Sequence, residues 1–308
     1  MNRFQFGAGK VGRGVASQAE LLRYEEKFQL IREKTTTMAS SPALTDNQLR
    51  FFKTFGYVLL RKFLRAGDLE ILAAELERGL RAQFPHKPFD GSQRQWSRMT
   101  DEATPFFASL MEDARFLTPA QQICGGDVLG IGIDANRYVG DTGWHPDTGH
   151  VHQIGVKYIF YLDQVSAASG ALRVIPGSHL LPQAEVEILA AGIRDRPLQE
   201  VPCQALDTEP GDVIAFDIRT WHASCGGGQD RRACNLDYFQ NPRAAGDIDL
   251  ILKLGRDHAR SIDHFDTRRK FNYSKNWLGN PHQSKIRQGW IDRFNEIGYL
   301  DQPGVAEL

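Results

Sequence analysis

Apolar positions in the first part of the chain recur at helical spacing. Thr45 and Gln48 form a capping box, which predicts the start of a helix that ends at Gly56. A longer pattern follows, with leucines on one face, before two prolines end it. A third helical pattern is interrupted near Pro119, because proline removes a backbone donor. The predicted helices span 45–55, 67–84 and 104–124.

Two other segments separate these helices. Residues 57–63 are mostly apolar and predict a strand. Residues 86–100 are polar and predict a loop that contains Trp96.

From Asp127 the pattern changes to short apolar runs punctuated by Gly and Pro. Many short strands of this kind indicate a sandwich or a jelly roll. One helical pattern, at 183–194, interrupts the series. Helices come first and strands later, so we predict a mainly β (α+β) fold with a β core over about 127–242. The predicted strands lie near 127–138, 151–163, 170–175, 200–206, 212–218 and 232–240.

The ends of the chain have weaker patterns. Residues 1–40 predict an N-terminal extension that is flexible or partly helical. Residues 256–282 are polar without a clear period and predict irregular structure. We therefore predict one domain over 41–308, whose part 243–308 consists of loops and a closing helix at 283–298. The inward positions of that helix are expected to be Ile286, Trp290, Ile291 and Phe294.

Composition excludes several classes of protein. With a net charge of −1 the chain has no global basic field, so neither a nucleic-acid nor a membrane partner is expected. No run of about 18 apolar residues and no apolar signal segment is present, which predicts a cytoplasmic protein. The cysteines form no C-x-x-C pair and are expected to be reduced thiols. They are Cys124, Cys203, Cys225 and Cys234.

One short segment has the composition of a metal site. His145 and Asp147 stand two residues apart, so in an extended chain both side chains point to one side. An imidazole and a carboxylate are two of the three ligands in the facial triad of non-haem Fe(II) oxygenases. His222 is the candidate for the third ligand, and three metal positions would remain for a co-substrate and O2. A His-x-Asp pair on a solvated edge looks the same, so a structural role stays open.

Three other histidines and two tryptophans could also belong to a metal site or border one. His150 and His152 have the same spacing and form an alternative pair, although a surface position is the simpler interpretation. His179 follows a Pro-Gly-Ser turn and is expected to be structural. Trp144 and Trp221 each precede a candidate ligand, so alternation directs them away from the metal.

Four segments, in their order and spacing, resemble the phytanoyl-CoA dioxygenase family of Fe(II)/2-oxoglutarate oxygenases. The most specific is the Gly-Ala-Leu-Arg-Val-Ile-Pro-Gly-Ser-His run that ends at His179. The resemblance extends from about residue 45 to about residue 242. The segments are Phe55–Leu59, Trp144–Asp147, Ser169–His179, and Gly211–Phe216 followed by Trp221-His222 and Arg231-Arg232-Ala233.

This resemblance implies a fold and a set of ligands. The fold would be a double-stranded β-helix, a jelly roll with the N-terminal helices on one outer face. Iron would be held by His145, Asp147 and His222. The distal carboxylate of 2-oxoglutarate would pair with an Arg on the last core strand and with Ser224. Only one of Arg231 and Arg232 can face the cavity, and Arg231 is preferred. An arginine suits this task because it meets a carboxylate with two charge-assisted hydrogen bonds.

The implied activity is that of a hydroxylase that acts on a small molecule with Fe(II), 2-oxoglutarate and O2 and releases succinate and CO2. Relatives that halogenate have Gly or Ala in place of the aspartate, so Asp147 disfavours halogenation. Desaturation or ring closure with the same cofactors stays open. So do a peptide hydroxylase, which nothing in the sequence favours, and a non-catalytic cupin-like metal-binding module.

The substrate is not defined by the sequence. Specificity is expected from the loops 86–104, 139–143, 180–200 and 256–282. They carry basic residues that are compatible with an anionic substrate, namely Arg94, Arg98, Arg268, Arg269 and Lys270. Arg137 and Lys157, on strands that should border the cavity, could serve the same purpose or face solvent.

Overall fold

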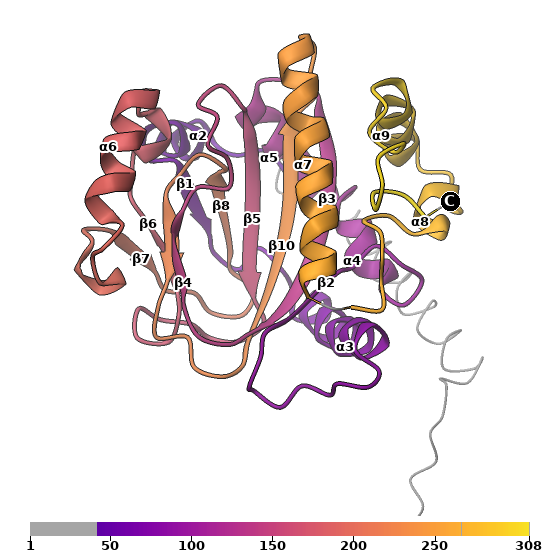
Figure 1. The fold of residues 1–308 in the computed structure, drawn as a ribbon, viewed down its shortest axis with the longest axis horizontal. Helices are drawn as coiled ribbons and strands as arrows, with labels where there is room; N and C mark the ends of the chain where they lie inside the picture. Colours follow the sequence, from indigo (N-terminus) through magenta and orange to yellow (C-terminus); the bar gives the residue numbers. More distant parts are fainter. Residues whose placement is uncertain (1–41, 266, 308) are drawn as a thin grey trace, which may run out of the picture. The chain divides into compact units, whose positions relative to one another are not determined.

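The strands form two antiparallel sheets that face each other as the layers of a jelly roll (Figure 1). The computed structural model describes residues 42–265 and 267–307, so the predicted extension 1–40 lies outside the described residues. The larger sheet has the order β1-β8-β5-β10-β3-β2 and the smaller one β4-β9-β6-β7. The larger sheet comprises β1 (Tyr57–Leu60), β2 (Gln95–Arg98), β3 (Val128–Tyr138), β5 (Gly155–Tyr161), β8 (Val213–Asp217) and β10 (Arg231–Gln240). The smaller comprises β4 (Thr142–His145), β6 (Leu172–Val174), β7 (Gln204–Leu206) and β9 (His222–Ser224). The predicted jelly roll is confirmed.

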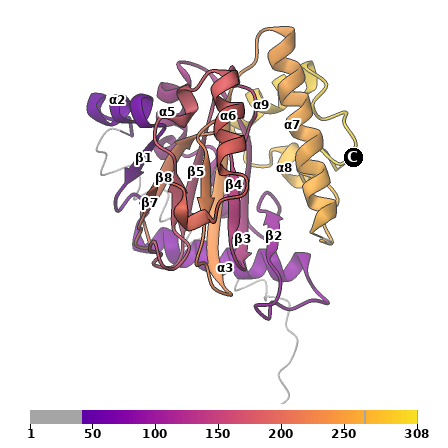
Figure 2. The same ribbon diagram turned by 60° about the vertical axis from the view of Figure 1, so that its left-hand side comes forward.

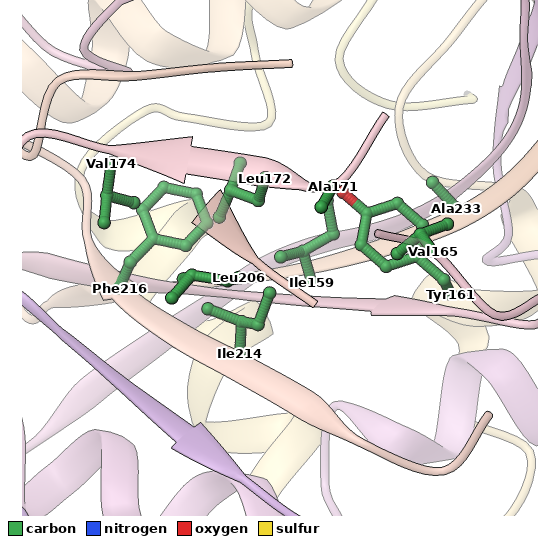
Figure 3. Close-up of a cluster of buried hydrophobic side chains, with 10 residues drawn as sticks. All are labelled: Ile159, Tyr161, Val165, Ala171, Leu172, Val174, Leu206, Ile214, Phe216 and Ala233. Carbon is green, nitrogen blue, oxygen red and sulfur yellow. The ribbon is translucent and has the colours of Figure 1, made fainter. Parts of the chain in front are cut away.

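Apolar side chains from both sheets meet between the layers (Figure 3). Ile159, Ile214 and Phe216 come from the larger sheet, while Leu172 and Val174 come from the smaller one. Burying each such side chain stabilises the fold by about 1.5–3 kcal/mol. These apolar side chains fill the space under the smaller sheet. The inner face of β10, β3 and β2 carries mainly polar residues instead.

Helices cover the outer face of the larger sheet, as predicted. Tyr158 and Tyr238 point outward and donate hydrogen bonds to the backbone oxygens of Phe116 (2.9 Å) and Met111 (2.7 Å). From the C-terminal helix, Trp290 donates to the backbone oxygen of Val128 (2.9 Å). Side chains alternate along a strand, so the residues directly before and after each tyrosine on β5 and β10 point inward, into the space between the sheets. The helices concerned are α4 (Pro105–Leu110), α5 (Ala114–Cys124) and α9 (Lys285–Glu296).

The N-terminal helices begin and end close to their predicted positions. In α2 (Asp46–Phe55) both hydrogen bonds of the Thr45–Gln48 capping box are present. The longer helix α3 (Ala66–Gln83) packs against α4 and β2. On the other side of the jelly roll, α6 (Gln183–Ile193) lies where a helix was predicted, between the short 3-10 helices η1 (Ser178–Leu180) and η2 (Leu198–Glu200).

The largest disagreement with the sequence patterns is α7 (Ala245–His264), a helix of 20 residues in a region predicted to be loop. Figure 1 shows it in front of β10 and β3. Its buried positions are few, Ile251, Gly255 and Ile262, because the same face also presents His258 and Ser261 to a polar cavity. That mixture breaks the apolar stripe by which a helix is detected. Among the described residues between α7 and α9, the short α8 (Lys275–Gly279) is the only helix in an otherwise irregular segment.

Three smaller expectations were wrong. The predicted loop 86–100 contains β2, whose four residues are all buried. Pro119 lies inside α5, and the break in this region occurs instead between α4 and α5, where Asp113 caps the second helix. Ile286 is 40% exposed, although its three partners on α9 are buried. In the described part of the chain, no helix has the length and apolarity needed to cross a membrane.

Candidate active site

Pairing between two strands of the smaller sheet brings the predicted metal ligands together. His145 on β4 is the direct partner of His222 on β9, and their ring centroids lie 4.3 Å apart. Asp147 follows β4, and its Oδ1 lies 4.0 Å from Nε2 of His222. One potential ligand atom from each of the three residues lies within 4.8 Å of the others. The structure thus places all three at one point, at one side of a cavity of about 360 Å³.

Backbone carbonyls orient both imidazoles. Nδ1 of His145 lies 2.7 Å from the oxygen of Gly143, and Nδ1 of His222 lies 2.9 Å from that of Thr220. A carbonyl can only accept, so each Nδ1 carries the proton and donates it. Each Nε2 therefore keeps a lone pair for a metal ion, which is the usual support for a metal-binding histidine.

The charges of the three residues suit a divalent cation. Burial, reinforced by His145 and Lys157, lowers the pKa of His222 to about 4 against the opposing effect of Asp147. Burial raises the pKa of Asp147, but the attraction of Lys157 and His222 outweighs it and brings the value down to about 2. At neutral pH His222 is neutral and Asp147 is ionised. Two imidazoles and one carboxylate are a donor set that fits Fe(II), and Oδ2 of Asp147 is buried without a hydrogen-bond partner.

Arg231 reaches the same cavity from β10. It is 4% exposed, and its Nη2 donates a hydrogen bond of 3.1 Å to Oγ of Ser224. Its Nε and Nη1 are buried without a partner, and its guanidinium lies 4.9 Å from the ring centroid of Tyr138. A buried guanidinium with free donors beside a hydroxyl fits a carboxylate ligand, as expected for the distal end of 2-oxoglutarate.

Two glycines make room for this guanidinium. A Cβ on Gly170 or on Gly227 would clash with Nη1 of Arg231. Gly170 also has φ of +91°, which other residues rarely adopt. The glycine that opens the Gly-Ala-Leu motif therefore has a physical role, namely to let the arginine lie flat beneath the loop.

The alternatives to these residues lie elsewhere. Arg232 points to the opposite side of β10, where its Nε donates to Asp163 at 3.0 Å. Arg137 pairs with Glu77 and Asp230 outside the cavity. The rival histidines at 150 and 152 are exposed. His179 lies against the backbone oxygen of Lys53, as expected for a structural residue.

The predicted environment of the tryptophans and cysteines also agrees with the structure. Trp144 and Trp221 point away from the triad and pack in a cluster with Ile193 and Val201 near α6. All four cysteines are free thiols, and none belongs to the triad cluster.

The cavity also contains Arg94, Arg98 and Lys157, which the sequence named only as candidates for binding an anion. Lys157 turns inward, and its Nζ lies 2.6 Å from Oδ1 of Asp147 and 3.8 Å from Oδ1 of Asp237. The sequence signal for this inward position was a lysine within an otherwise apolar strand. Arg98 reaches the cavity from β2, whereas Arg269 instead donates to backbone oxygens, including that of Asn272 at 2.7 Å. The remaining polar and aromatic contributors are Trp96, Asp134, Asn235, His258, Ser261 and Phe265.

Comparison with known proteins decides the family. The sequence model of the phytanoyl-CoA dioxygenase family matches residues 52–233. The chain belongs to that family. It is a 2-oxoglutarate-dependent non-haem iron dioxygenase that uses Fe(II), 2-oxoglutarate and O2, and a non-catalytic metal-binding module is not supported.

Individual relatives are distant. The ectoine dioxygenase of Bordetella parapertussis (strain 12822 / ATCC BAA-587 / NCTC 13253) is 22% identical over 219 residues, covering 59% of this chain and 70% of that protein. HygX from Streptomyces hygroscopicus, solved with nickel and 2-oxoglutarate, has a TM-score of 0.55 at 20% identity, with 64% of this chain and 88% of that one covered. The α-ketoglutarate-dependent epimerase SnoN from nogalamycin biosynthesis has a TM-score of 0.53 at 18% identity, with 64% and 83% covered. At these identities the solved structures establish the fold alone.

Proposed function

We propose that this dioxygenase hydroxylates a small organic molecule while 2-oxoglutarate is converted to succinate and CO2. The observation that carries the proposal is the shared cavity of the triad and Arg231. A volume of about 360 Å³ lies in the range of small-ligand pockets, so the co-substrate and a small substrate are the natural occupants.

The residues of the triad are proposed to hold the iron. His145 and His222 would bind it through Nε2, because Nδ1 is committed to a backbone carbonyl in each case. Asp147 would bind it through the oxygen that Lys157 leaves free. Iron bound there would supply the activation of O2 that oxidation of an unactivated C–H bond requires.

Arg231 and Ser224 are proposed to bind the distal carboxylate of 2-oxoglutarate. The unpartnered Nε and Nη1 of Arg231 offer the carboxylate two donors. Ser224 already accepts from Nη2, so its own hydrogen is available for the same carboxylate. Tyr138 stacks near the guanidinium and limits its exposure to water, which strengthens the pair.

Desaturation or ring closure is the alternative outcome. Relatives with this fold include an epimerase and a carbocyclase, so the fold accommodates several oxidative outcomes. In this chain Asp147 would occupy the metal position that halogenation requires, which disfavours halogenation but none of the other oxidative outcomes.

The test is release of succinate from 2-oxoglutarate by the purified protein with Fe(II), across classes of small substrate, in ¹⁸O2. A hydroxylase gives a product with one labelled oxygen, whereas desaturation or ring closure gives an unlabelled product two mass units lighter. His150→Ala is a matched control for His145→Ala, because it removes an exposed histidine near the site. If the protein neither forms succinate nor develops the visible band of an Fe(II)–2-oxoglutarate complex, the proposed function is wrong.

A further inference from the structure

Arg98 has the features of a second anion site in the cavity. It is 2% exposed, and its Nε and Nη1 are buried without a hydrogen-bond partner. The nearest carboxylate oxygen is Oδ2 of Asp134, 3.9 Å from Nη1, too far for a hydrogen bond. The other oxygen of Asp134 already accepts from Asn136 and Asn235. Burying charged donors without partners is costly, so the position calls for an anionic ligand.

The neighbouring strand is shaped to admit this side chain. Gly132 on β3 lies beneath the guanidinium, and a Cβ there would clash with Nη1 of Arg98. The backbone of Gly132 is ordinary extended strand, so its small size serves Arg98 rather than a turn. The arrangement matches that at Arg231, where Gly170 and Gly227 provide the space.

A hydrogen-bond acceptor lies next to these free donors. Asp237 is the direct partner of Gly132 across β10 and β3, and its Oδ1 is buried without a hydrogen-bond partner. Lys157, 3.8 Å from that oxygen, also holds Asp147 of the triad. Unsatisfied donors and an unsatisfied acceptor therefore lie side by side, close to the proposed iron ligands.

Helix α7 closes this part of the cavity. His258, Ser261 and Phe265 come from α7 and the residue that follows it, and the ring centroids of Phe265 and Trp96 lie 5.3 Å apart.

The two arginines of the cavity lie far apart along β3. Arg98 pairs with Asp134 and Arg231 pairs with Tyr138, four residues further along the strand. At about 3.3 Å per residue this separates the two arginines by roughly 13 Å along the strand. The Arg98 guanidinium lies against Gly132, farther still from Tyr138, whereas the Arg231 guanidinium lies 4.9 Å from the ring centroid of Tyr138, so one carboxylate cannot pair with both.

We propose that Arg98 binds a carboxylate of the substrate and that Asp237 accepts a hydrogen bond from an amino or hydroxyl group of the same molecule. The substrate class is thus a small amino or hydroxy acid, bound between β2, β3, β10 and α7. This inference rests on the proposed function and specifies its substrate. It also gives α7 a role, as the wall that encloses the acid beside the iron ligands.

The test measures binding apart from turnover. The protein is loaded with Fe(II) and saturating 2-oxoglutarate under argon, and formation of the complex is checked by its visible band. Calorimetric titration then compares a panel of L-amino acids and 2-hydroxy acids with their primary amides and with the acids that lack the amino or hydroxyl group. We expect at least one acid to bind, and its amide to bind at least ~10-fold more weakly, because a neutral amide loses the charge-assisted pair.

Variants connect this preference to the residues. Arg98→Met should weaken binding of the acid at least ~10-fold and leave the amide unchanged, while Arg98→Lys should restore part of the loss. Gly132→Ala should reproduce the effect by displacing Arg98, and Asp237→Asn should remove the preference for the amino or hydroxyl group. Arg268→Met, at an exposed position, is the matched control. Thermal melting confirms that each variant is folded.

The outcomes separate the two proposals. The inference is overturned if no acid of the panel binds to a protein that shows the Fe(II)–2-oxoglutarate band, if the amide binds as well as its acid, or if Arg98→Met keeps the preference for the acid. Absence of the band in the unmodified protein contradicts the proposed function instead. Arg98→Met should keep its affinity for 2-oxoglutarate and Arg231→Met should lose it, so the two anion sites are distinguished directly.

Discussion

Nζ of Lys157 lies 2.6 Å from Oδ1 of Asp147, while Oδ2 of the same carboxylate is buried without a partner. The lysine thus fixes one oxygen and leaves the other for the proposed metal ion. It also places a positive charge beside a cation site. That charge lowers the pKa of both Asp147 and His222, so protons compete less with the metal ion for both ligands.

Replacement of Lys157 should therefore shift the acid limit of metal binding. In Lys157→Met the lysine no longer offsets the effect of burial, so the pKa of Asp147 rises. The pKa of His222 rises as well, because the nearby positive charge is lost. Both ligands then bind protons at a higher pH. We expect Fe(II) affinity, measured anaerobically at a series of pH values, to begin its decline at a higher pH than in the unmodified protein. Lys157→Arg keeps the charge and should keep the original dependence; an unchanged profile for Lys157→Met would contradict this account.

Much of the site could be predicted from local sequence. The two-residue spacing of His145 and Asp147 specifies a shared side in any extended segment, and the structure confirms it. Alternation along β10 separates Arg231 from Arg232, because one strand cannot present consecutive residues to the same cavity. These relationships depend only on neighbours in the chain.

The substrate end of the cavity could be predicted only in part: Arg98 was a candidate for an anionic substrate, but its strand and helix α7 were not predicted. Arg98 lies on a strand of four residues within a polar segment, and its environment is created by Gly132 on another strand. The helix that carries His258 presents a polar inner face, so it lacks the apolar stripe that would have identified it. Pairing of distant segments produces this compartment, and no local pattern records that pairing.

The metal triad gives the most direct prediction. His145→Ala, Asp147→Ala and His222→Ala should each reduce bound Fe(II), determined by elemental analysis after anaerobic loading and desalting, to background. The reason is that each removes one of the three proposed protein ligands. His152→Ala removes an exposed histidine and should retain iron. Full iron content in all three triad variants, with unaltered melting temperatures, would rule out the triad.

Arg231→Ala should weaken the use of 2-oxoglutarate specifically. Loss of a buried charged partner costs about 2–5 kcal/mol, which appears as a large rise in KM for 2-oxoglutarate. Arg232→Ala is the matched control, since its side chain pairs with Asp163 on the other face of the strand. Steady-state kinetics of succinate release provide the measurement, and a larger effect in the Arg232 variant would mean that the strand register is misassigned.

Asp237 should make the stability of the metal-free protein depend on pH. Burial raises its pKa from 3.8 to about 6, against the attraction of Lys157 and Arg98. Because the folded pKa lies above the unfolded value, its contribution to stability is fully present below pH 3.8 and is lost as the pH rises through 6. At about 1.4 kcal/mol per pH unit, the loss amounts to about 3 kcal/mol. Urea unfolding at pH 4 to 7.5 should show the free energy of unfolding of the unmodified protein falling relative to that of Asp237→Asn; a constant difference would disprove the raised pKa.

The presence of Asp147 predicts that the protein does not halogenate its substrate. The carboxylate lies within 4.8 Å of the ligand atoms of both histidines, so it would provide the third protein ligand of the proposed octahedral metal site. 2-Oxoglutarate would take two further positions and O2 would need the one that remains, so no position would be left for chloride. Mass spectrometry of the product formed in excess chloride or bromide should therefore show oxygen but no halogen. Asp147→Gly removes the carboxylate and tests whether its loss frees a position on the metal ion. It should either lose iron, because two protein ligands are too few, or bind halide in the vacated position. Halogen in the product of the unmodified protein would show that Asp147 does not hold the metal position assigned to it.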